Sequence, residues 1–307
     1  MIAIRTLISA AVVLGFAGAA QAAGKLDLTN PDDILKASAK VSCSLVDGKP
    51  TIYWWEGKTY GRRPGERDRH LFNVQGMNIR ACKVFNDPKR GFGYRSVSRE
   101  VMFHLDPKTN EVLRTWKNPW TGEEVEVIQV NNDPVNMRQP TFARDENGKP
   151  TARFRYFEHD GSFLSGGGAA RLFYDNPLSG EYQDYVGGTY HAMEFGTDTV
   201  NMEQLLDADS VEVTDAVLSW ARVSKWLPWM KMGDRDGVII YHTAGIKVPR
   251  FEDLPEPMKG EIKKNYPIYQ QPPPLDDARP NETTWTVTKK FIDGQRAKQG
   301  GAKPKAE

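Results

Sequence analysis

Two histidines and one arginine have the side chains best suited to chemistry. They are His191, His242 and Arg222, and each lies in a run typical of a β-strand: residues 189–195, 237–248 and 216–223. A neutral imidazole can move a proton, and a guanidinium can stabilise developing negative charge. Together they would suit a cofactor-independent lyase, isomerase or hydrolase. The simpler interpretation is that each histidine makes an ordinary core hydrogen bond and that Arg222 pairs with a carboxylate.

Other catalytic and metal sites have less support in the sequence. The 5 histidines form no His-x-His or His-Glu-x-x-His pattern, and no cysteine cluster is present, so we expect no metal and no cofactor. Gly166-Gly-Gly168 lacks the Lys-Ser/Thr of a phosphate-binding loop and is interpreted as a flexible turn. A Gly-x-Ser-x-Gly nucleophile elbow is also missing.

The loop from Trp226 to Gly233 concentrates more apolar and aromatic surface than any other predicted loop. It contains Trp226, Trp229, Met230 and Met232 between two strand-like runs, which predicts two antiparallel strands joined by a long connection. Trp is large and rigid, and Met adapts to irregular partners, so the loop would suit a lid over an apolar or aromatic ligand. The equally favoured alternative is a plug that closes one end of the core.

Strand alternation groups the candidates by face. Arg222 shares a face with Trp220, and His104 shares one with Glu100 and Met102, whereas Glu194 lies opposite the face of His191. The sequence does not fix which face points inward. Aromatic residues with a few polar groups are typical of a barrel lumen that binds one small ligand. The predicted ligand-binding residues are Trp220, Trp226, Trp229, Met230, Tyr241, His104 and Trp116.

The predicted fold is mainly β. Strand-like runs separated by regular turn signals, such as residues 98–105, 111–117 and 123–130, indicate a meander. We therefore expect a single large antiparallel β-barrel, a meander of the calycin or lipocalin kind, with peripheral helices; a two-sheet sandwich is the alternative. Asn30-Pro31 should open one helix, and Thr284 to Thr288 reads as a last strand.

The chain is predicted to contain one domain between two non-globular ends. Residues 1–22 have the charged start, apolar run and Ala-Gln-Ala cleavage site of a secretory signal peptide. The single domain covers residues 23–292, and residues 293–307 form a charged tail expected to be disordered. This pattern predicts export to a bacterial periplasm. No later stretch is apolar enough for a membrane span, and the formal net charge of +1 makes a nucleic-acid partner unlikely.

The chain has 2 cysteines, Cys43 and Cys82. In an oxidising compartment such a pair favours a disulfide, which would stabilise the fold by roughly 4 kcal/mol through chain entropy. Two buried free thiols are the alternative, because the sequence does not fix the distance between them.

The order of motifs resembles the domain of unknown function 1838 family. The resembling segments span nearly the whole mature chain: Asp106-Pro-Lys-Thr, Trp116-Lys-Asn-Pro-Trp-Thr-Gly-Glu123, Asn132-Asp-Pro-Val135, Tyr174-Asp-Asn-Pro-Leu178, Trp226-Leu-Pro-Trp-Met-Lys-Met-Gly233 and Tyr241-His-Thr-Ala-Gly245. The resemblance implies a single domain. It implies no activity and no catalytic residues.

Three functions are compatible with these observations. The first is an exported protein that binds an apolar or aromatic small molecule in a barrel cavity under the Trp226 to Gly233 loop. The second is an enzyme that uses His191, His242 and Arg222 in that cavity. The third is a scaffold partner for an envelope complex, suggested only by the Pro-rich segment at Gln271 to Pro274, which a strap packed on the surface explains equally well. The oligomeric state is not predicted.

Overall fold

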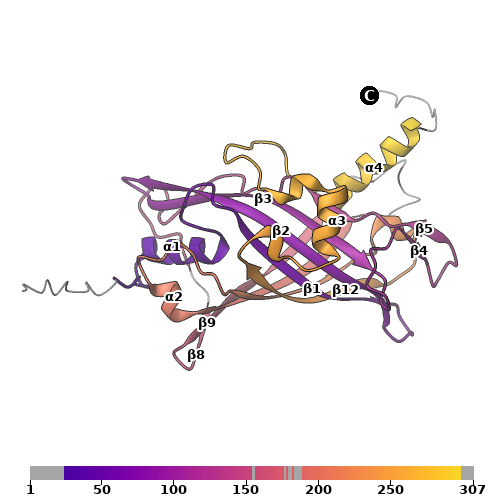
Figure 1. The fold of residues 1–307 in the computed structure, drawn as a ribbon, viewed down its shortest axis with the longest axis horizontal. Helices are drawn as coiled ribbons and strands as arrows, with labels where there is room; N and C mark the ends of the chain where they lie inside the picture. Colours follow the sequence, from indigo (N-terminus) through magenta and orange to yellow (C-terminus); the bar gives the residue numbers. More distant parts are fainter. Residues whose placement is uncertain (1–23, 154–155, 176–177, 179–181, 183–188, 299–307) are drawn as a thin grey trace, which may run out of the picture.

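The computed structural model describes residues 24–153, 156–175, 178, 182 and 189–298. Most of them form one antiparallel sheet of ten strands in the order β6-β3-β2-β1-β12-β11-β10-β9-β8, with β7 paired to β3 (Figure 1). Its strands are β1 Thr51–Arg62, β2 Arg69–Asp87, β3 Gly91–Leu105, β6 Val130–Asn132, β7 Thr141–Phe142, β8 Tyr156–His159, β9 Phe163–Tyr174, β10 Tyr190–Asn201, β11 Val217–Ser224 and β12 Val238–Val248. The mainly β, antiparallel prediction is confirmed.

The sheet is curled, and its pairing is open. Residues of β3 and β10 line one cavity although β2, β1, β12 and β11 lie between them in the sheet, so the sheet must bend strongly across its width. Among the described residues β6 and β8 end the order and do not pair with each other. The predicted closed barrel is therefore not found. A two-sheet sandwich does not describe the fold either, because one sheet contributes both the inner and the outer core.

β2 runs unbroken from Arg69 to Asp87, and one predicted turn is also continuous strand. Gly166 to Gly168, interpreted as a flexible turn, lies in the middle of β9 and pairs with β10. The hairpin expected to extend the meander is a separate small sheet of β4 Thr115–Lys117 and β5 Glu124–Glu126. A glycine in a strand often marks curvature or close approach, so glycine content alone misled the turn prediction.

Four α-helices lie around the sheet: α1 Pro31–Ser42, α2 Met202–Leu206, α3 Met258–Asn265 and α4 Thr284–Lys298. α1 begins as predicted, because the Asn30 side chain accepts a hydrogen bond from the Asp32 amide at 2.9 Å. Thr284 to Thr288 is not a strand but the first part of α4, whose face of Trp285, Thr288 and Ile292 is buried at helical spacing. The first residues of the predicted tail, up to Lys298, are thus helical.

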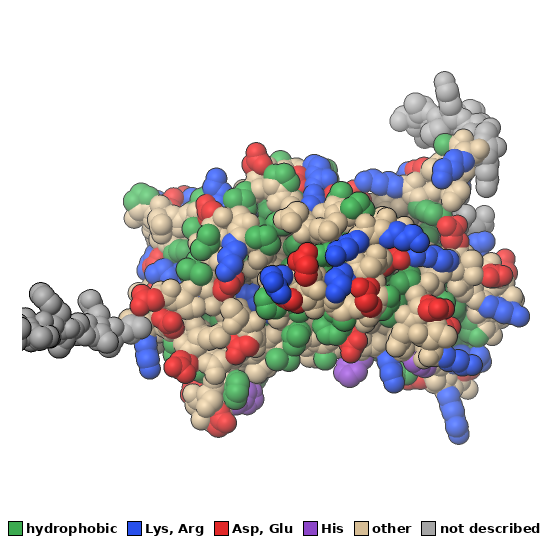
Figure 2. Space-filling view, viewed as in Figure 1, with side chains coloured by type: hydrophobic (Ala, Val, Ile, Leu, Met, Phe, Trp, Pro, Cys, Tyr) green, Lys and Arg blue, Asp and Glu red, His purple; other side chains and the backbone are tan. Residues whose placement is uncertain are grey.

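The two ends of the sheet are closed by different elements. In Figure 1, α1 and α2 lie at one end and the β4–β5 hairpin at the other, while α3 crosses one face. Under α3, the outer core joins Met77, Phe103 and Ile262. Figure 2 shows acidic and basic side chains intermingled over this side of the molecule. None of the helices in the described ranges is long and apolar enough to cross a membrane.

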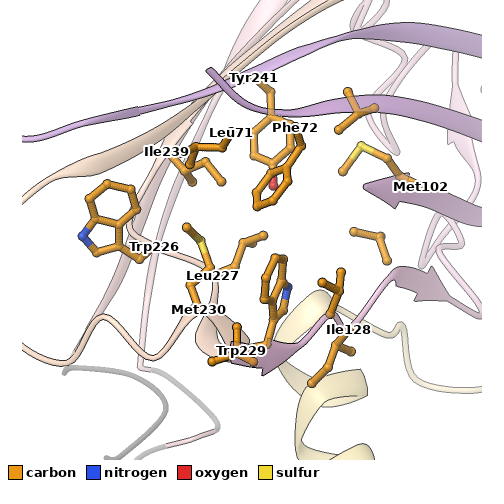
Figure 3. Packing of buried hydrophobic residues seen from close by; sticks show 14 of the residues in the cluster. Leu71, Phe72, Met102, Ile128, Trp226, Leu227, Trp229, Met230, Ile239 and Tyr241 are labelled. Atoms are coloured by element: carbon orange, nitrogen blue, oxygen red, sulfur yellow. The ribbon is translucent and has the colours of Figure 1, made fainter. Parts of the chain in front are cut away.

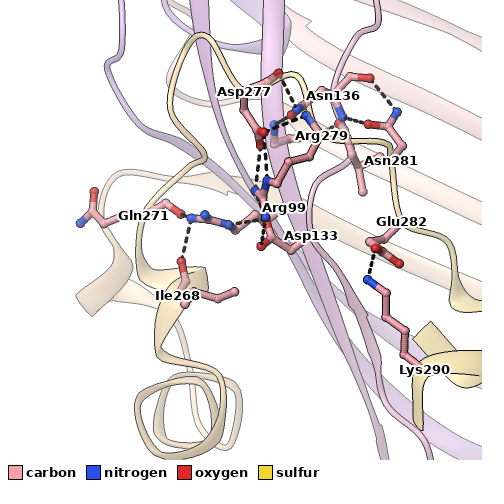
Figure 4. A network of polar contacts seen from close by, with 12 residues as sticks. Arg99, Asp133, Asn136, Ile268, Gln271, Asp277, Arg279, Asn281, Glu282 and Lys290 are labelled. Carbon is pink, nitrogen blue, oxygen red and sulfur yellow. Dashed lines mark hydrogen bonds and ion pairs between the residues drawn. The ribbon is translucent and has the colours of Figure 1, made fainter. Parts of the chain in front are cut away.

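The Pro-rich segment is a strap held against β3 by polar contacts (Figure 4). Arg99 of β3 donates to the backbone carbonyls of Ile268 at 3.0 Å and Gln271 at 2.6 Å. It also pairs with Asp133 at 2.6 Å, and Asp133 in turn pairs with Arg279 at 3.1 Å. These contacts fix the segment on the protein's own surface, as the strap interpretation expects.

Cys43 and Cys82 form a disulfide, with their Cα atoms 6.1 Å apart. It ties the end of α1 to β2 and is buried with Leu35, Phe92 and Ala143. The predicted signal peptide, and the part of the predicted tail beyond Lys298, lie outside the described residues.

Candidate functional site

The inner face of the curled sheet encloses a cavity of about 280 Å³, called here the concave cavity. Its walls come from β1, β2, β3, β10 and β11, with the end of α1 and the start of α4 at its edge. Two aromatic and four charged side chains are among its lining residues: Trp55, Trp220, Arg80, Glu100, Asp198 and Arg222. A second hollow of about 310 Å³ shares Val41, Ser42 and Asp198 with it, so the space continues under α1.

Two indole rings form the apolar walls. Trp55 of β1 and Trp220 of β11 lie with ring centroids 6.5 Å apart and planes tilted by 54°. Trp55 fits because Gly76 stands opposite it on β2: a Cβ at Gly76 would come within 2.2 Å of the indole. Gly196 of β10 leaves part of the cavity empty, since an added Cβ there would meet no atom within 4 Å. Glycines thus both seat one ring and keep the space open.

Charged side chains line the same cavity. The Arg222 guanidinium pairs with the Glu194 carboxylate at 3.1 Å and donates a hydrogen bond to the Tyr190 hydroxyl. The Arg80 Nε donates to Asn78 Oδ1 at 2.7 Å. No hydrogen bond or ion pair among the described residues involves the carboxyls of Glu100 or Asp198.

The pKa shifts reflect this uneven pairing. Burial raises the pKa of Glu100, and nearby Glu194 adds to the rise, while Arg222 and Arg80 offset part of it. Burial likewise raises the pKa of Asp198 despite the nearby charge of Arg80. Burial would lower the pKa of Arg222, but its phenol and carboxylate neighbours outweigh it and hold the pKa above its usual value. The arginine is firmly charged, and the two lone carboxyls are poorly compensated.

The Trp226 to Gly233 loop fills the neighbouring part of the inner face. Its residues Trp226, Leu227, Trp229, Met230 and Met232 are buried against the sheet; we call them, with their sheet partners Phe72 and Tyr241, the plug cluster. Figure 3 shows Trp229 beside Met230 and Ile128, with Phe72 and Tyr241 across from it. Trp229 is only 2% exposed, and none of the loop residues lines the concave cavity. The loop has the geometry of a plug.

A buried polar chain runs through the plug cluster. The His104 Nδ1 lies 3.1 Å from Gln129 Oε1, and its Nε2 lies 3.3 Å from the Tyr241 hydroxyl. Gln129 donates its own amide to the Leu113 carbonyl at 2.8 Å, so its oxygen is free to accept from His104 Nδ1. The histidine then accepts from Tyr241. Burial lowers the pKa of His104 to about 4, so the imidazole is neutral.

A family model of a protein of unknown function, DUF1838, matches residues 48–292. The chain belongs to the DUF1838 family. That match confirms the resemblance seen in the motifs and covers the sheet, the plug cluster and the strap. A search of curated proteins gave no match.

One solved structure similar to this DUF1838 chain is a LolA superfamily protein from Nitrosomonas europaea. The similarity covers 74% of this chain and 96% of that one, with 11% sequence identity and a TM-score of 0.16. A TM-score this low supports no conclusion about a shared fold or ligand.

The structure separates the three predicted catalytic residues. Arg222 lines the cavity, but His191 and His242 are exposed on the outer face of the sheet. Strand pairing explains this: Glu194 lies opposite Arg222 on the inner face, which sends His191 outward, and Tyr241 points inward, which sends His242 outward. The expectation that both histidines share a cavity with Arg222 is therefore not met.

The predicted ligand-binding residues divide between two places. Trp220 lines the concave cavity. The others gather in or against the plug cluster: Trp226, Trp229, Met230, Tyr241, His104 and Trp116. Trp220 and Tyr241 connect the two places, with ring centroids 5.7 Å apart. Among the described residues no group of His, Cys, Asp and Glu side chains could hold a metal ion.

Sequence reasoning missed most of the cavity's polar residues. Glu100 was correctly grouped on one face with Met102 and His104, but its face was not recognised as the inner one. Asp198 lies beyond the predicted strand of residues 189–195, and the strand that contains Arg80 was not divided into faces. The available signal was glycine at in-strand positions such as Gly76 and Gly196, which marks close approach or open space.

Proposed function

We propose that this DUF1838 protein binds a small molecule in the concave cavity, against the indole rings of Trp55 and Trp220. One observation carries the proposal: the cavity of about 280 Å³ is bounded by aromatic rings and by a few convergent polar groups. Ligand sites are typically concave and mostly apolar, with a small number of placed polar groups. The volume lies near the lower end of the usual range of about 300–1,000 Å³, which favours a small ligand.

The apolar part of the ligand would lie along the indoles. Stacking on an aromatic face adds about 0.5–1.5 kcal/mol beyond burial alone. The polar part would face Glu100 and Asp198, whose carboxyls have no protein partner in the described residues. The plug cluster closes the neighbouring end of the inner face, so the loop restricts the space without touching the ligand.

The first experiment is mass spectrometry of a solvent extract from protein purified from a periplasmic fraction. A stoichiometric small molecule would support the proposal and give its chemical class. The test variant is Gly196→Leu, because a Cβ at this lining position would meet no atom within 4 Å and the rest of the side chain would occupy cavity space. Its control is Gly168→Leu, because Gly168 pairs with Gly196 across the ladder, has equally open surroundings and does not line the cavity. Loss of the molecule in both variants, or in neither, would contradict the proposed site.

Export to the periplasm is part of the proposal. It is supported by the N-terminal sequence pattern and by the Cys43–Cys82 disulfide, since disulfides persist in oxidising compartments. Cell fractionation followed by N-terminal sequencing tests it. The expected mature chain begins at Ala23; full-length protein retained in the cytosol would contradict it.

An enzyme remains the second candidate, with Glu100 rather than a histidine carrying the proton. The supporting observation is that burial raises the pKa of Glu100, while Arg222 beside it stays charged. A carboxyl with a raised pKa can act as a general acid or base near neutral pH. Incubating the extracted molecule with fresh protein distinguishes the candidates: conversion lost in Glu100→Gln supports the enzyme, and recovery of the unchanged molecule supports the binding protein.

A further inference from the structure

The concave cavity has more acidic than basic groups. Its lining contains three carboxyls, Glu100, Glu194 and Asp198, and two guanidiniums, Arg80 and Arg222. Glu194 and Arg222 pair with each other at 3.1 Å, and the Arg222 Nε has no hydrogen-bond partner among the described residues. Two carboxyls and one guanidinium are left.

The remaining arginine forms no ion pair with either remaining carboxyl, and its charge offsets only part of the rise in their pKa values. Arg80 directs its Nε to Asn78 and lies over the Tyr53 ring at 5.2 Å, and it forms no ion pair within the described residues. The buried Lys247, whose charge offsets part of the rise in the pKa of Asp198, uses its ammonium on backbone carbonyls, at 2.7 Å from Val213 and 3.2 Å from Lys40. Glu100 and Asp198 thus face the cavity with unused hydrogen-bond acceptors.

An ionised carboxyl in such a place is costly unless a donor or a cation compensates it. Burial raises the pKa of both groups, and the nearby protein cations offset only part of that rise. The apolar walls suit the same kind of partner. A cation over the face of Trp or Tyr gains about 0.5–2 kcal/mol from the ring's electron density. Trp55, Trp220 and Tyr53 all line the cavity.

We propose that the ligand is an organic cation, an amine attached to a flat or aromatic body, whose ammonium group sits between Glu100 and Asp198. This inference rests on the proposed function and adds the charge of the ligand. Glu100 comes from β3 and Asp198 from β10, so the ammonium would bridge two strands that the curl of the sheet brings together. The ring of the ligand would lie against Trp55 and Trp220.

The test uses three probes of one shape and different charge: phenethylamine, 2-phenylethanol and phenylacetate. Their dissociation constants are measured by ligand-observed NMR with the mature protein at pH 7.5. We expect phenethylamine to bind at least about tenfold more tightly than 2-phenylethanol, a difference of about 1.4 kcal/mol, and phenylacetate to bind most weakly. Glu100→Gln and Asp198→Asn should each reduce the amine preference, and the double variant should abolish it.

The controls separate this inference from the proposed function. Gly196→Leu should weaken all binding at the cavity, whereas Gly168→Leu should leave it unchanged. If 2-phenylethanol or phenylacetate binds as well as the amine and Gly196→Leu blocks it, the cation inference is overturned and the cavity remains a binding site. If none of the probes binds the wild-type protein, the inference is overturned as well. The co-purified molecule then decides the proposed function on its own. An amine preference that survives in the double variant would also overturn the assigned role of the two carboxyls.

Discussion

The inner face of the sheet has two adjoining regions that are filled in opposite ways. In the plug cluster, every large apolar side chain of the Trp226 to Gly233 loop is buried, and the Tyr241 hydroxyl lies 3.3 Å from His104 Nε2. In the concave cavity, Trp55 and Trp220 face open space. The carboxyls of Glu100 and Asp198 have no hydrogen-bond or ion-pair partner among the described residues. Trp220 and Tyr241 touch across the boundary.

The residues whose types suggest a binding site in the sequence are therefore not the residues whose surfaces are free to contact a ligand. The plug cluster holds the residues that look most like a binding site in the sequence, yet their surfaces are already used in packing. Gly76 makes room for the Trp55 ring, and Gly196 leaves part of the cavity empty. None of the described residues forms a hydrogen bond or ion pair with the carboxyls of Glu100 and Asp198. A ligand can gain only from groups that the fold has left unused.

The largest expected effect separates the two regions by stability. Trp229→Ala should lower the free energy of unfolding by about 4 kcal/mol, because Trp229 is 2% exposed and the cavity it leaves cannot fully collapse. Trp220→Ala is the matched control: the ring is only partly buried, so it should cost clearly less and weaken binding instead. Urea denaturation and probe binding measure both. Equal losses of stability in the two variants would remove the distinction drawn between the regions.

The second effect concerns the wall of the cavity. Replacing Cys43 and Cys82 by serine should lower the free energy of unfolding by up to about 4 kcal/mol, because the unfolded chain loses a long covalent loop. α1 contributes Val41 and Ser42 to the cavity, so hydrogen exchange should rise there while the plug cluster stays protected. Uniformly faster exchange across both regions would argue that the disulfide stabilises the whole sheet rather than this wall.

The third effect uses the pH dependence of the plug cluster. The unfolded state takes up a proton on His104 near pH 6.5, and the folded state only near pH 4. The unfolded state therefore binds more protons in between, and the free energy of unfolding should fall by roughly 3 kcal/mol as the pH drops through that window. His104→Gln should remove this slope, and the exposed control His191→Gln should keep it. A slope that persists without His104 would point to another buried group.

The sequence predicts local structure well and the architecture only in part. Helix α1 was predicted from its cap, and the pairing of β11 with β12 from two runs of β-branched residues, because both depend on neighbouring positions. Thr284 to Thr288 was misread because its β-branched threonines favour a strand locally, whereas burial of Trp285 and Ile292 at helical spacing favours a helix. Whether a curled sheet closes depends on pairing between distant strands, which no local pattern contains.

The site was predicted less well for a related reason. Alternation correctly placed Trp220 with Arg222 and Glu100 with Met102, but a period of two cannot say which face is inside. That choice decided the outcome for His191 and His242. The sequence also gives no sign that a carboxyl such as Asp198 lacks a partner, since pairing is a property of the packed structure.

The smallest expected effect concerns Glu100. Its contribution to stability depends on pH in the opposite direction to that of His104. Its pKa is raised in the folded state by burial and by Glu194, so the stability it contributes is present below its unfolded pKa and is lost as pH rises through its folded pKa. Glu100→Gln should therefore raise the melting temperature at pH 7.5 and leave it nearly unchanged at pH 4. The same variant should show a reduced preference for phenethylamine over 2-phenylethanol at pH 7.5. The control variant is Glu194→Gln, because removing the carboxylate partner of Arg222 should lower stability. Gln75→Glu is not a suitable control, because Gln75 does not line the concave cavity.

A Glu100→Gln variant that destabilises the protein at neutral pH would show that a partner compensates this carboxyl. The plug cluster and the concave cavity would then not differ in how their polar groups are paired.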